Sequence, residues 1–140
     1  MNEILVVTDA SWIVDAVRAA VGKNDVVVHV GSGARVREVV AERQPTLVVL
    51  DSQIGSMGGI AVCHDLRLEE GMDRLPRTAL LLLLDRRADV HLARRADLDG
   101  WVVKPLDSRR LSRAIRAVAD GEQFFDDSFA PAATTAPVAP

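Results

Sequence analysis

The stretch LVVLD, residues 47–51, runs four aliphatic side chains directly into an aspartate, and SQIGSMGG follows at residues 52–59. Similar short runs recur along the chain without alternating with polar residues: ILVV at 4–7, VVVHV at 26–30, ALLLLL at 79–84 and WVV at 101–103. Continuous runs of this length are typical of strands buried on both faces, which belong to parallel sheets covered by helices. The runs therefore predict five parallel strands.

Apolar residues at helical spacing lie between and after these runs. They predict five helices, which carry the pairs Ile13 and Val17, Val36 and Val40, Cys63 and Leu66, Val90 and Ala93, and Leu111 and Ile115. Strict alternation of strand and helix predicts an α/β fold, a doubly wound five-stranded parallel sheet flanked by five helices in a single domain. This domain is expected to span residues 1–123, and residues 124–140 to form a disordered tail rich in Ala and Pro.

The overall composition excludes several classes of protein. Lys and Arg total 17 against 20 for Asp and Glu, a net charge of −3, so we expect no direct binding to nucleic acid. The single cysteine, Cys63, excludes an intramolecular disulfide. The most apolar run, residues 79–84, is far shorter than the about 20 residues that span a bilayer. We expect a soluble, cytoplasmic protein that does not enter the membrane.

Charged residues stand just after three of the predicted strands: Asp9, Asp51 and Lys104. In an open parallel sheet, ligands bind beyond the carboxyl ends of the strands. Two carboxylates brought together repel each other, so a divalent cation is expected between them. Each residue also has a structural alternative. Asp9 could cap a helix, Asp51 could be a turn residue that accepts hydrogen bonds from its own loop, and Lys104 could be a solvated charge. Their joint placement at strand ends favours a functional site.

Three motifs, ILVVTD, LVVLD with its glycine-rich loop, and GWVVKPLD, resemble in their order and spacing the receiver domain of bacterial two-component response regulators. The resemblance covers residue 1 to about residue 123 and implies a flavodoxin-like, CheY-like fold. It implies that Asp51 accepts a phosphoryl group from a sensor histidine kinase or a phosphotransfer protein. It further implies Mg²⁺ held by Asp9, Asp51 and the Gln53 carbonyl, a phosphoryl contact from Lys104, a cis Lys104–Pro105 bond, and a switch aromatic at Trp101.

The sequence departs from the family pattern at two positions. Thr8 stands where receivers carry the first of two adjacent acids, which predicts weaker Mg²⁺ binding. Leu84 or Asp85 stands where receivers present a Ser or Thr hydroxyl, and no Ser or Thr occurs between Ala79 and Asp107. Without that hydroxyl, we expect weak coupling between phosphorylation and the surface formed by the fourth helix, fifth strand and fifth helix. The charge of Asp85 would also oppose an incoming phosphoryl group.

That surface is basic. Residues 86–116 hold nine basic and four acidic residues, 9 − 4 = +5, although a solvated face is the commoner explanation of such a run. A downstream protein with an acidic surface, or a second copy of the chain, would bind there. The candidate contact residues are Arg94, Arg95, Arg109 and Arg113.

Three functional interpretations follow. The first is an atypical stand-alone receiver, not an enzyme, that is phosphorylated on Asp51 and signals through protein contacts. The second is a pseudo-receiver that acts as an interaction or dimerisation module without phosphate. The third is a flavin or nucleotide enzyme, for which GSGAR at residues 31–35 offers only a fragment of a dinucleotide fingerprint. The residues after the fifth predicted helix are too few for a DNA-binding module.

Overall fold

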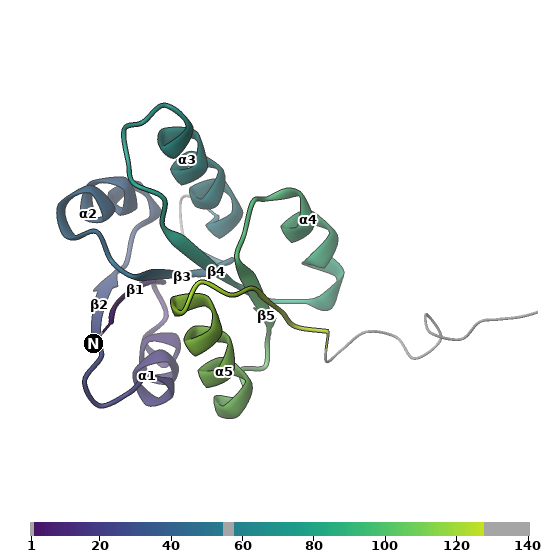
Figure 1. Ribbon diagram of the computed structural model, residues 1–140. Coiled ribbons are helices and arrows are strands. Elements are labelled where there is room, and N and C mark those ends of the chain that lie inside the picture. Colours follow the sequence, from purple (N-terminus) through teal and green to yellow (C-terminus); the bar gives the residue numbers. More distant parts are fainter. Residues whose placement is uncertain (1, 55–57, 128–140) are drawn as a thin grey trace, which may run out of the picture.

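The computed structural model describes residues 2–54 and 58–127 and shows one parallel sheet with helices on both faces (Figure 1). The sheet order is β2-β1-β3-β4-β5-β6. The strands are β1 (Glu3–Val7), β2 (Val26–Val30), β3 (Leu47–Asp51), β4 (Ala79–Leu84), β5 (Gly100–Val103) and β6 (Phe124–Phe125). The helices are α1 (Ser11–Ala20), α2 (Val36–Arg43), α3 (Gly59–Gly71), α4 (Val90–Arg95) and α5 (Ser108–Ala119), with short 3₁₀ turns η1 (Gly33–Arg35) and η2 (Arg87–Asp89).

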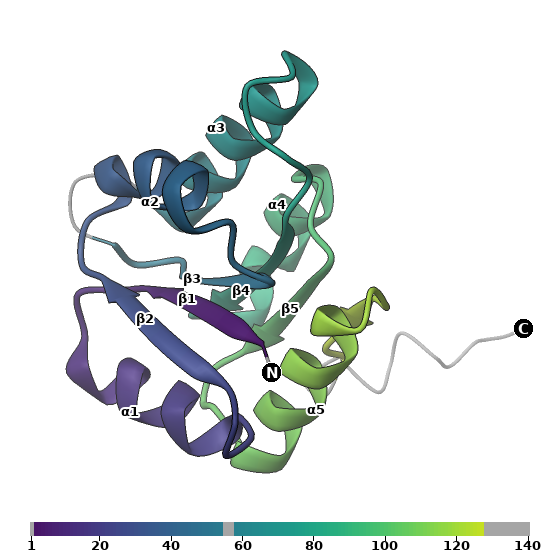
Figure 2. The same cartoon turned by 60° about the vertical axis from the view of Figure 1, so that its left-hand side comes forward.

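The helices divide between the two faces of the sheet, which gives two separate cores. Helices α2, α3 and α4 cover one face, and α1 and α5 cover the other (Figures 1 and 2). Successive residues of one strand enter different cores: Leu80, Leu82 and Leu84 pack with α2, α3 and α4, whereas Leu81 and Leu83 pack with α1 and α5. This double burial confirms the α/β doubly wound fold that the aliphatic runs predict.

The sheet has one short strand more than the five predicted, and this strand lies where the tail was expected to begin. Phe124 and Phe125 form β6, which pairs in parallel with Gly100 and Trp101 of β5. A two-residue strand has no periodic pattern, so the sequence gives no signal for it. Residues 128–140 of the predicted tail, and residues 55–57 of the glycine-rich loop, lie outside the described residues.

Contacts on both sides hold β6 against β5. A Cβ atom at Gly100 would lie 2.4 Å from the Phe124 carbonyl oxygen, so only glycine permits this approach. Gly121, with φ of 88°, reverses the chain after α5. The buried Asp126 carboxylate accepts a 2.9 Å hydrogen bond from the Val103 amide and lies 3.0 Å from Arg110 Nε. The segment after α5 is therefore part of the folded domain.

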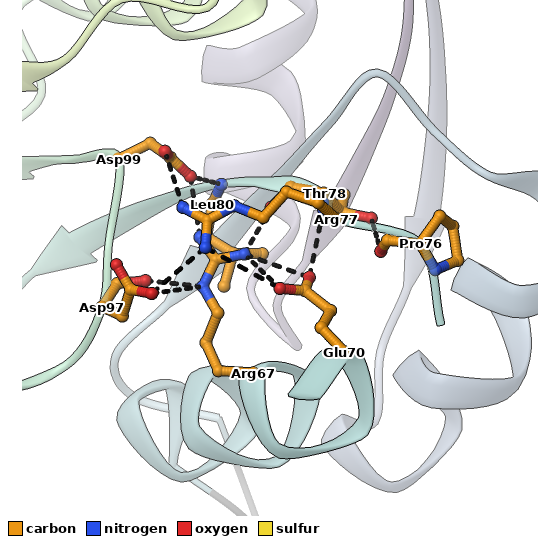
Figure 3. Close-up of polar contacts among 8 residues, drawn as sticks. All are labelled: Arg67, Glu70, Pro76, Arg77, Thr78, Leu80, Asp97 and Asp99. Carbon is orange, nitrogen blue, oxygen red and sulfur yellow. Dashed lines mark hydrogen bonds and ion pairs between the residues drawn. The ribbon is translucent and has the colours of Figure 1, made fainter. Parts of the chain in front are cut away.

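At the opposite end of β4 and β5, an arginine of α3 ties three segments together (Figure 3). Arg67 lies 2.8 Å from both Glu70 and Asp99, and it donates to the Thr78 and Asp97 carbonyl oxygens at 2.8 and 2.7 Å. Its side chain is only 10% exposed. The guanidinium thus joins α3 to the residues that precede β4 and β5.

No helix in the described part of the chain is long and apolar enough to cross a bilayer.

We expect Arg67→Ala to lower the free energy of unfolding by about 3–5 kcal/mol, because it removes the guanidinium that joins the partly buried Glu70 and Asp99. Arg77 is the matched control, since it pairs with Asp97 and Asp99 at 3.1 and 3.3 Å but is 57% exposed. Arg77→Ala should cost less than about 1 kcal/mol. Urea unfolding measures both values, and equal losses for the two variants would contradict the structural role given to Arg67.

Candidate functional site

The carboxyl ends of four neighbouring strands bring polar side chains to one edge of the sheet. Thr8 follows β1, Asp51 ends β3, Asp85 follows β4 and Lys104 follows β5. Because β3 lies between β1 and β4, Asp51 is central in this group. This is the end of an open parallel sheet at which ligands bind.

The Asp51 carboxylate is fixed by three donors. Its Oδ1 accepts hydrogen bonds from Lys104 Nζ at 2.8 Å and from the Gln53 amide at 3.1 Å, and its Oδ2 accepts from the Thr8 hydroxyl at 2.7 Å. The residue is 2% exposed. Helix α3 begins directly against it, since a Cβ on Gly59 would lie 2.4 Å from the Asp51 carbonyl oxygen. Both carboxylate oxygens are therefore engaged inside the protein.

Lys104 bridges two acids. Its ammonium lies 2.8 Å from Asp51 Oδ1 and 2.5 Å from Asp85 Oδ1. Burial acts to lower the pKa of Lys104, but hydrogen bonds to Asp51 and Asp85, together with their charges, outweigh it and raise that pKa above its ordinary value. The ammonium also lies 5.9 Å from the ring centroid of Trp12. The bond from Lys104 to Pro105 is cis, which confirms that expectation.

Of the two residues that could face the site after β4, it is Asp85 that does so. Leu84 is fully buried and belongs to the core under α2, α3 and α4. The Asp85 carboxylate instead contacts Lys104, at a place where the family presents a neutral hydroxyl. The sequence predicted a missing hydroxyl, and the structure adds a charged replacement.

Thr8 does more than remove a negative charge. It is fully buried, and its hydroxyl donates to Asp51 while accepting a 3.1 Å hydrogen bond from the Ala10 amide. Its carbonyl oxygen lies 2.7 Å from His29 Nε2. These contacts hold the hydroxyl in place against Oδ2 of Asp51.

The oxygen atoms that the resemblance assigns to Mg²⁺ are those of Asp9, Asp51 and Gln53. Asp9 and Gln53 are exposed beside the buried Asp51. Within residues 2–54 and 58–127, no group of three or more His, Cys, Asp or Glu side chains could hold a metal ion. Mg²⁺ often binds through one or two carboxylates and retains several waters, so a set of two carboxylates and one carbonyl fits it, with one acid fewer than receivers usually carry.

The serine in the segment at residues 31–35 has a structural contact of its own. The Ser32 hydroxyl accepts a 3.3 Å hydrogen bond from the Ala34 amide and caps η1. This contact accounts for the serine as a capping residue.

The protein-family model for the response regulator receiver domain matches residues 4–116 of this chain. The chain belongs to the response regulator receiver family. It is 32% identical over 110 residues to the DNA-binding transcriptional activator DevR/DosR of Mycobacterium tuberculosis, covering 77% of this chain and 48% of that protein. It is 29% identical over 104 residues to a nitrate/nitrite response regulator protein homolog of Haemophilus influenzae, covering 74% and 49%. The chain thus spans about half the length of these curated relatives.

Solved structures of other response regulators share the fold. A LuxR-family two-component response regulator from Aurantimonas superposes with a TM-score of 0.78 at 22% identity, covering 93% of each chain. The chemotaxis response regulator CheY4 of Vibrio cholerae gives a TM-score of 0.72 at 18% identity, covering 84% of this chain and 98% of that one. At these identities the likeness supports the receiver fold alone.

The receiver's predicted switch aromatic, Trp101, is enclosed on both sides. Its ring centroid lies 4.4 Å from that of Phe125, and the Arg94 guanidinium lies 5.4 Å from it on the side of α4. Trp101 is 4% exposed, and its indole nitrogen is buried without a hydrogen-bond partner among the described residues. The role of Trp101 as a switch stays a prediction, and in this structure rotation would require Phe125 to move.

The predicted partner surface is exposed but differently built from the expectation. Arg94, Arg95, Arg109 and Arg113 are all exposed. Arg94 and Arg95 line a groove with Leu98, Trp101 and Phe125. The expected dimer contact involves the fourth helix, the fifth strand and the fifth helix, and in the structure β6 pairs with the outer edge of that strand. A second copy would therefore meet β6 instead of β5.

The Lys104 ion pairs give a pH dependence whose direction is fixed by the raised pKa. The stabilisation from Lys104 is complete below its ordinary pKa of 10.5 and is lost as the pH rises through the higher folded value. Denaturant titrations between about pH 9 and about pH 12 should show a larger loss of stability in the wild type than in Lys104→Met.

The chain has no tyrosine and Lys23 is the other lysine, but burial raises the pKa of the Cys63 thiol to about 12, so Cys63 adds a loss of stability over the same range to the wild type and to each variant. Lys23 is exposed and does not belong to the site, so Lys23→Met is the matched control and should keep the wild-type loss. A Lys104→Met protein that loses as much stability at high pH as the wild type would refute the assignment.

Proposed function

We propose that this receiver accepts a phosphoryl group on Asp51 and signals through protein contacts. Phosphoryl acceptance is the general role of the family to which the chain belongs. The observation that carries the proposal is the 2.8 Å contact between Lys104 Nζ and Asp51 Oδ1, at the end of the central strand β3. This contact supplies a positive charge beside the attacking oxygen, where an incoming phosphoryl group adds negative charge.

In the proposed transfer, a carboxylate oxygen of Asp51 attacks the phosphorus of a phosphohistidine on a sensor kinase or phosphotransfer protein. A P–O bond forms, the P–N bond breaks, and the departing imidazole nitrogen takes a proton from water. Positioning and charge neutralisation dominate such a step. Thr8 and Lys104 each donate to a different oxygen of Asp51, so these hydrogen bonds orient the carboxylate for the attack. The chain acts as an acceptor in the cytoplasm, not as an enzyme that turns over a small molecule.

Mg²⁺, when bound, supplies further positive charge at the phosphoryl oxygens. The carboxylates of Asp9 and Asp51 and the carbonyl of Gln53 would hold it. Thr8 offers a neutral hydroxyl where a second acid would hold the waters of the ion, which supports weak binding.

A phosphate-independent interaction module is the second candidate. The three hydrogen bonds that Asp51 accepts from within the chain favour it, because these contacts hold the site together without any ligand. Basic residues of α4 and α5 would then bind an acidic partner in a single conformation. Labelling of Asp51 separates the two functions.

We expect acetyl phosphate with Mg²⁺ to add one phosphoryl group to the wild type, detected by intact mass. Asp51→Asn should abolish the addition, since it removes the nucleophilic carboxylate. Asp97→Asn, which alters an exposed acid at the other end of the sheet, is the control and should be labelled like the wild type. Labelling of Asp51→Asn to the same extent as the wild type would contradict the assignment of Asp51 as the acceptor. A wild type that is not labelled would favour the second function.

Thr8→Asp should tighten Mg²⁺ binding on the order of tenfold, because a third carboxylate, beside those of Asp9 and Asp51, replaces a neutral hydroxyl at the ion site. Titration followed by emission of Trp12, whose ring lies near Lys104, measures the change. Thr8→Val is the matched comparison, since it removes the hydroxyl without adding charge. Equal affinity for Thr8→Asp and the wild type would count against the proposed ion site.

A further inference from the structure

We propose that Asp85 is a built-in competitor for Lys104, and that phosphorylation of Asp51 acts on the segment between β4 and α4 by expelling this carboxylate. The inference rests on the proposed function and concerns the regulation of the same site. In this mechanism the segment moves because Asp85 is repelled by the phosphoryl group. The attraction of a Ser or Thr hydroxyl at the end of β4, which this chain lacks, is not needed.

The geometry makes Asp85 the replaceable partner of the ammonium. Lys104 has three N–H donors, and two of them are directed to Asp51 and Asp85. The Asp51 side chain is 2% exposed, whereas that of Asp85 is 29% exposed. Asp85 can therefore exchange the ammonium for water at a low cost, and Asp51 cannot.

Phosphorylation changes the charge balance at this point. In the resting site, one ammonium is shared by two carboxylates. Phosphorylation replaces the single negative charge of the Asp51 carboxylate with a phosphoryl group of about −1.5 to −2, whose three strong acceptor oxygens face the same ammonium. Asp85 then faces a stronger competitor and a like charge at once, so the resting arrangement loses its attraction. The carboxylate of Asp85 therefore moves away from Lys104.

The segment that follows Asp85 is suited to move. Residues 86–88 are exposed, and the ion pair from Arg86 to Asp89 has an arginine side chain that is 74% exposed. In contrast, Leu84 is fully buried and anchors the end of β4. Segments with few buried contacts open most readily, so the hinge falls between Leu84 and Asp85.

Movement of this segment reaches the partner surface through α4. This helix has only six residues, Val90–Arg95, and follows η2 directly. Its Arg94 stacks over Trp101, beside the groove that Arg94 and Arg95 line with Phe125. A ligand shifts a conformation only by the difference in its interaction free energy with the two states. The contact between Asp85 and Lys104 provides such a difference, so coupling is larger than the missing hydroxyl alone predicts.

Beryllium fluoride with Mg²⁺, used as the phosphoryl mimic on the full chain, tests the inference. Asp85→Asn removes the charge and keeps the shape, and Asp85→Ala removes the contact altogether. Both should bind the mimic on the order of tenfold more tightly than the wild type, since the competing carboxylate is gone. Glu122→Gln removes an exposed acid in the turn after α5 and should bind like the wild type.

Amide hydrogen exchange gives the second readout. In the wild type, exchange across residues 85–95 should rise when the mimic saturates the site. In Asp85→Ala it should be high without the mimic and should not rise further. Equal affinities in wild type and variants, or unchanged exchange of residues 85–95 at saturation, would overturn the competitor role while leaving the phosphoacceptor intact. Failure of every protein to bind the mimic would instead overturn the proposed function, and the competitor role with it.

Discussion

Burial of the central strands on both faces is the constraint on which this molecule depends. Strands β1, β3 and β4 are packed between two layers of helices, so their interiors accept only apolar side chains. Polar residues are therefore confined to the strand ends, and parallel pairing brings those ends to one edge of the sheet. Asp51 lies at the centre of that edge because β3 lies between β1 and β4.

Charge at this edge is arranged around a single ammonium. Lys104 is partly buried, and the acids on either side of it come from different strands, β3 and the end of β4. Removing a partner from such a group leaves a charge uncompensated, which is why its members are coupled. The site is therefore sensitive to any added charge, even though Thr8 gives it one acid fewer than the family usually carries.

The fold was predictable from the aliphatic runs, because a parallel strand that is buried on both faces consists of consecutive apolar residues. The site was predictable in part: Asp51 and Lys104 lie together as expected, yet the hydrogen bond from Thr8 and the contact of Asp85 depend on side-chain direction. Sequence spacing could not choose between Leu84 and Asp85, because a shift of one residue reverses the face of a strand. Gly59 offered a signal, since a glycine opening a helix after a strand end indicates close backbone approach.

The short strand β6 has a consequence for solubility. Without it, β5 would be the last strand of the sheet and would present unpaired backbone groups, a template for association between sheets. Phe124 and Phe125 occupy that edge, and the Asp126 carboxylate accepts a hydrogen bond from the Val103 amide that lies beyond them. The new edge is only two residues long and is followed by two aspartates, so it is too short and too charged to recruit another strand. The chain thus protects its own sheet from edge-to-edge aggregation.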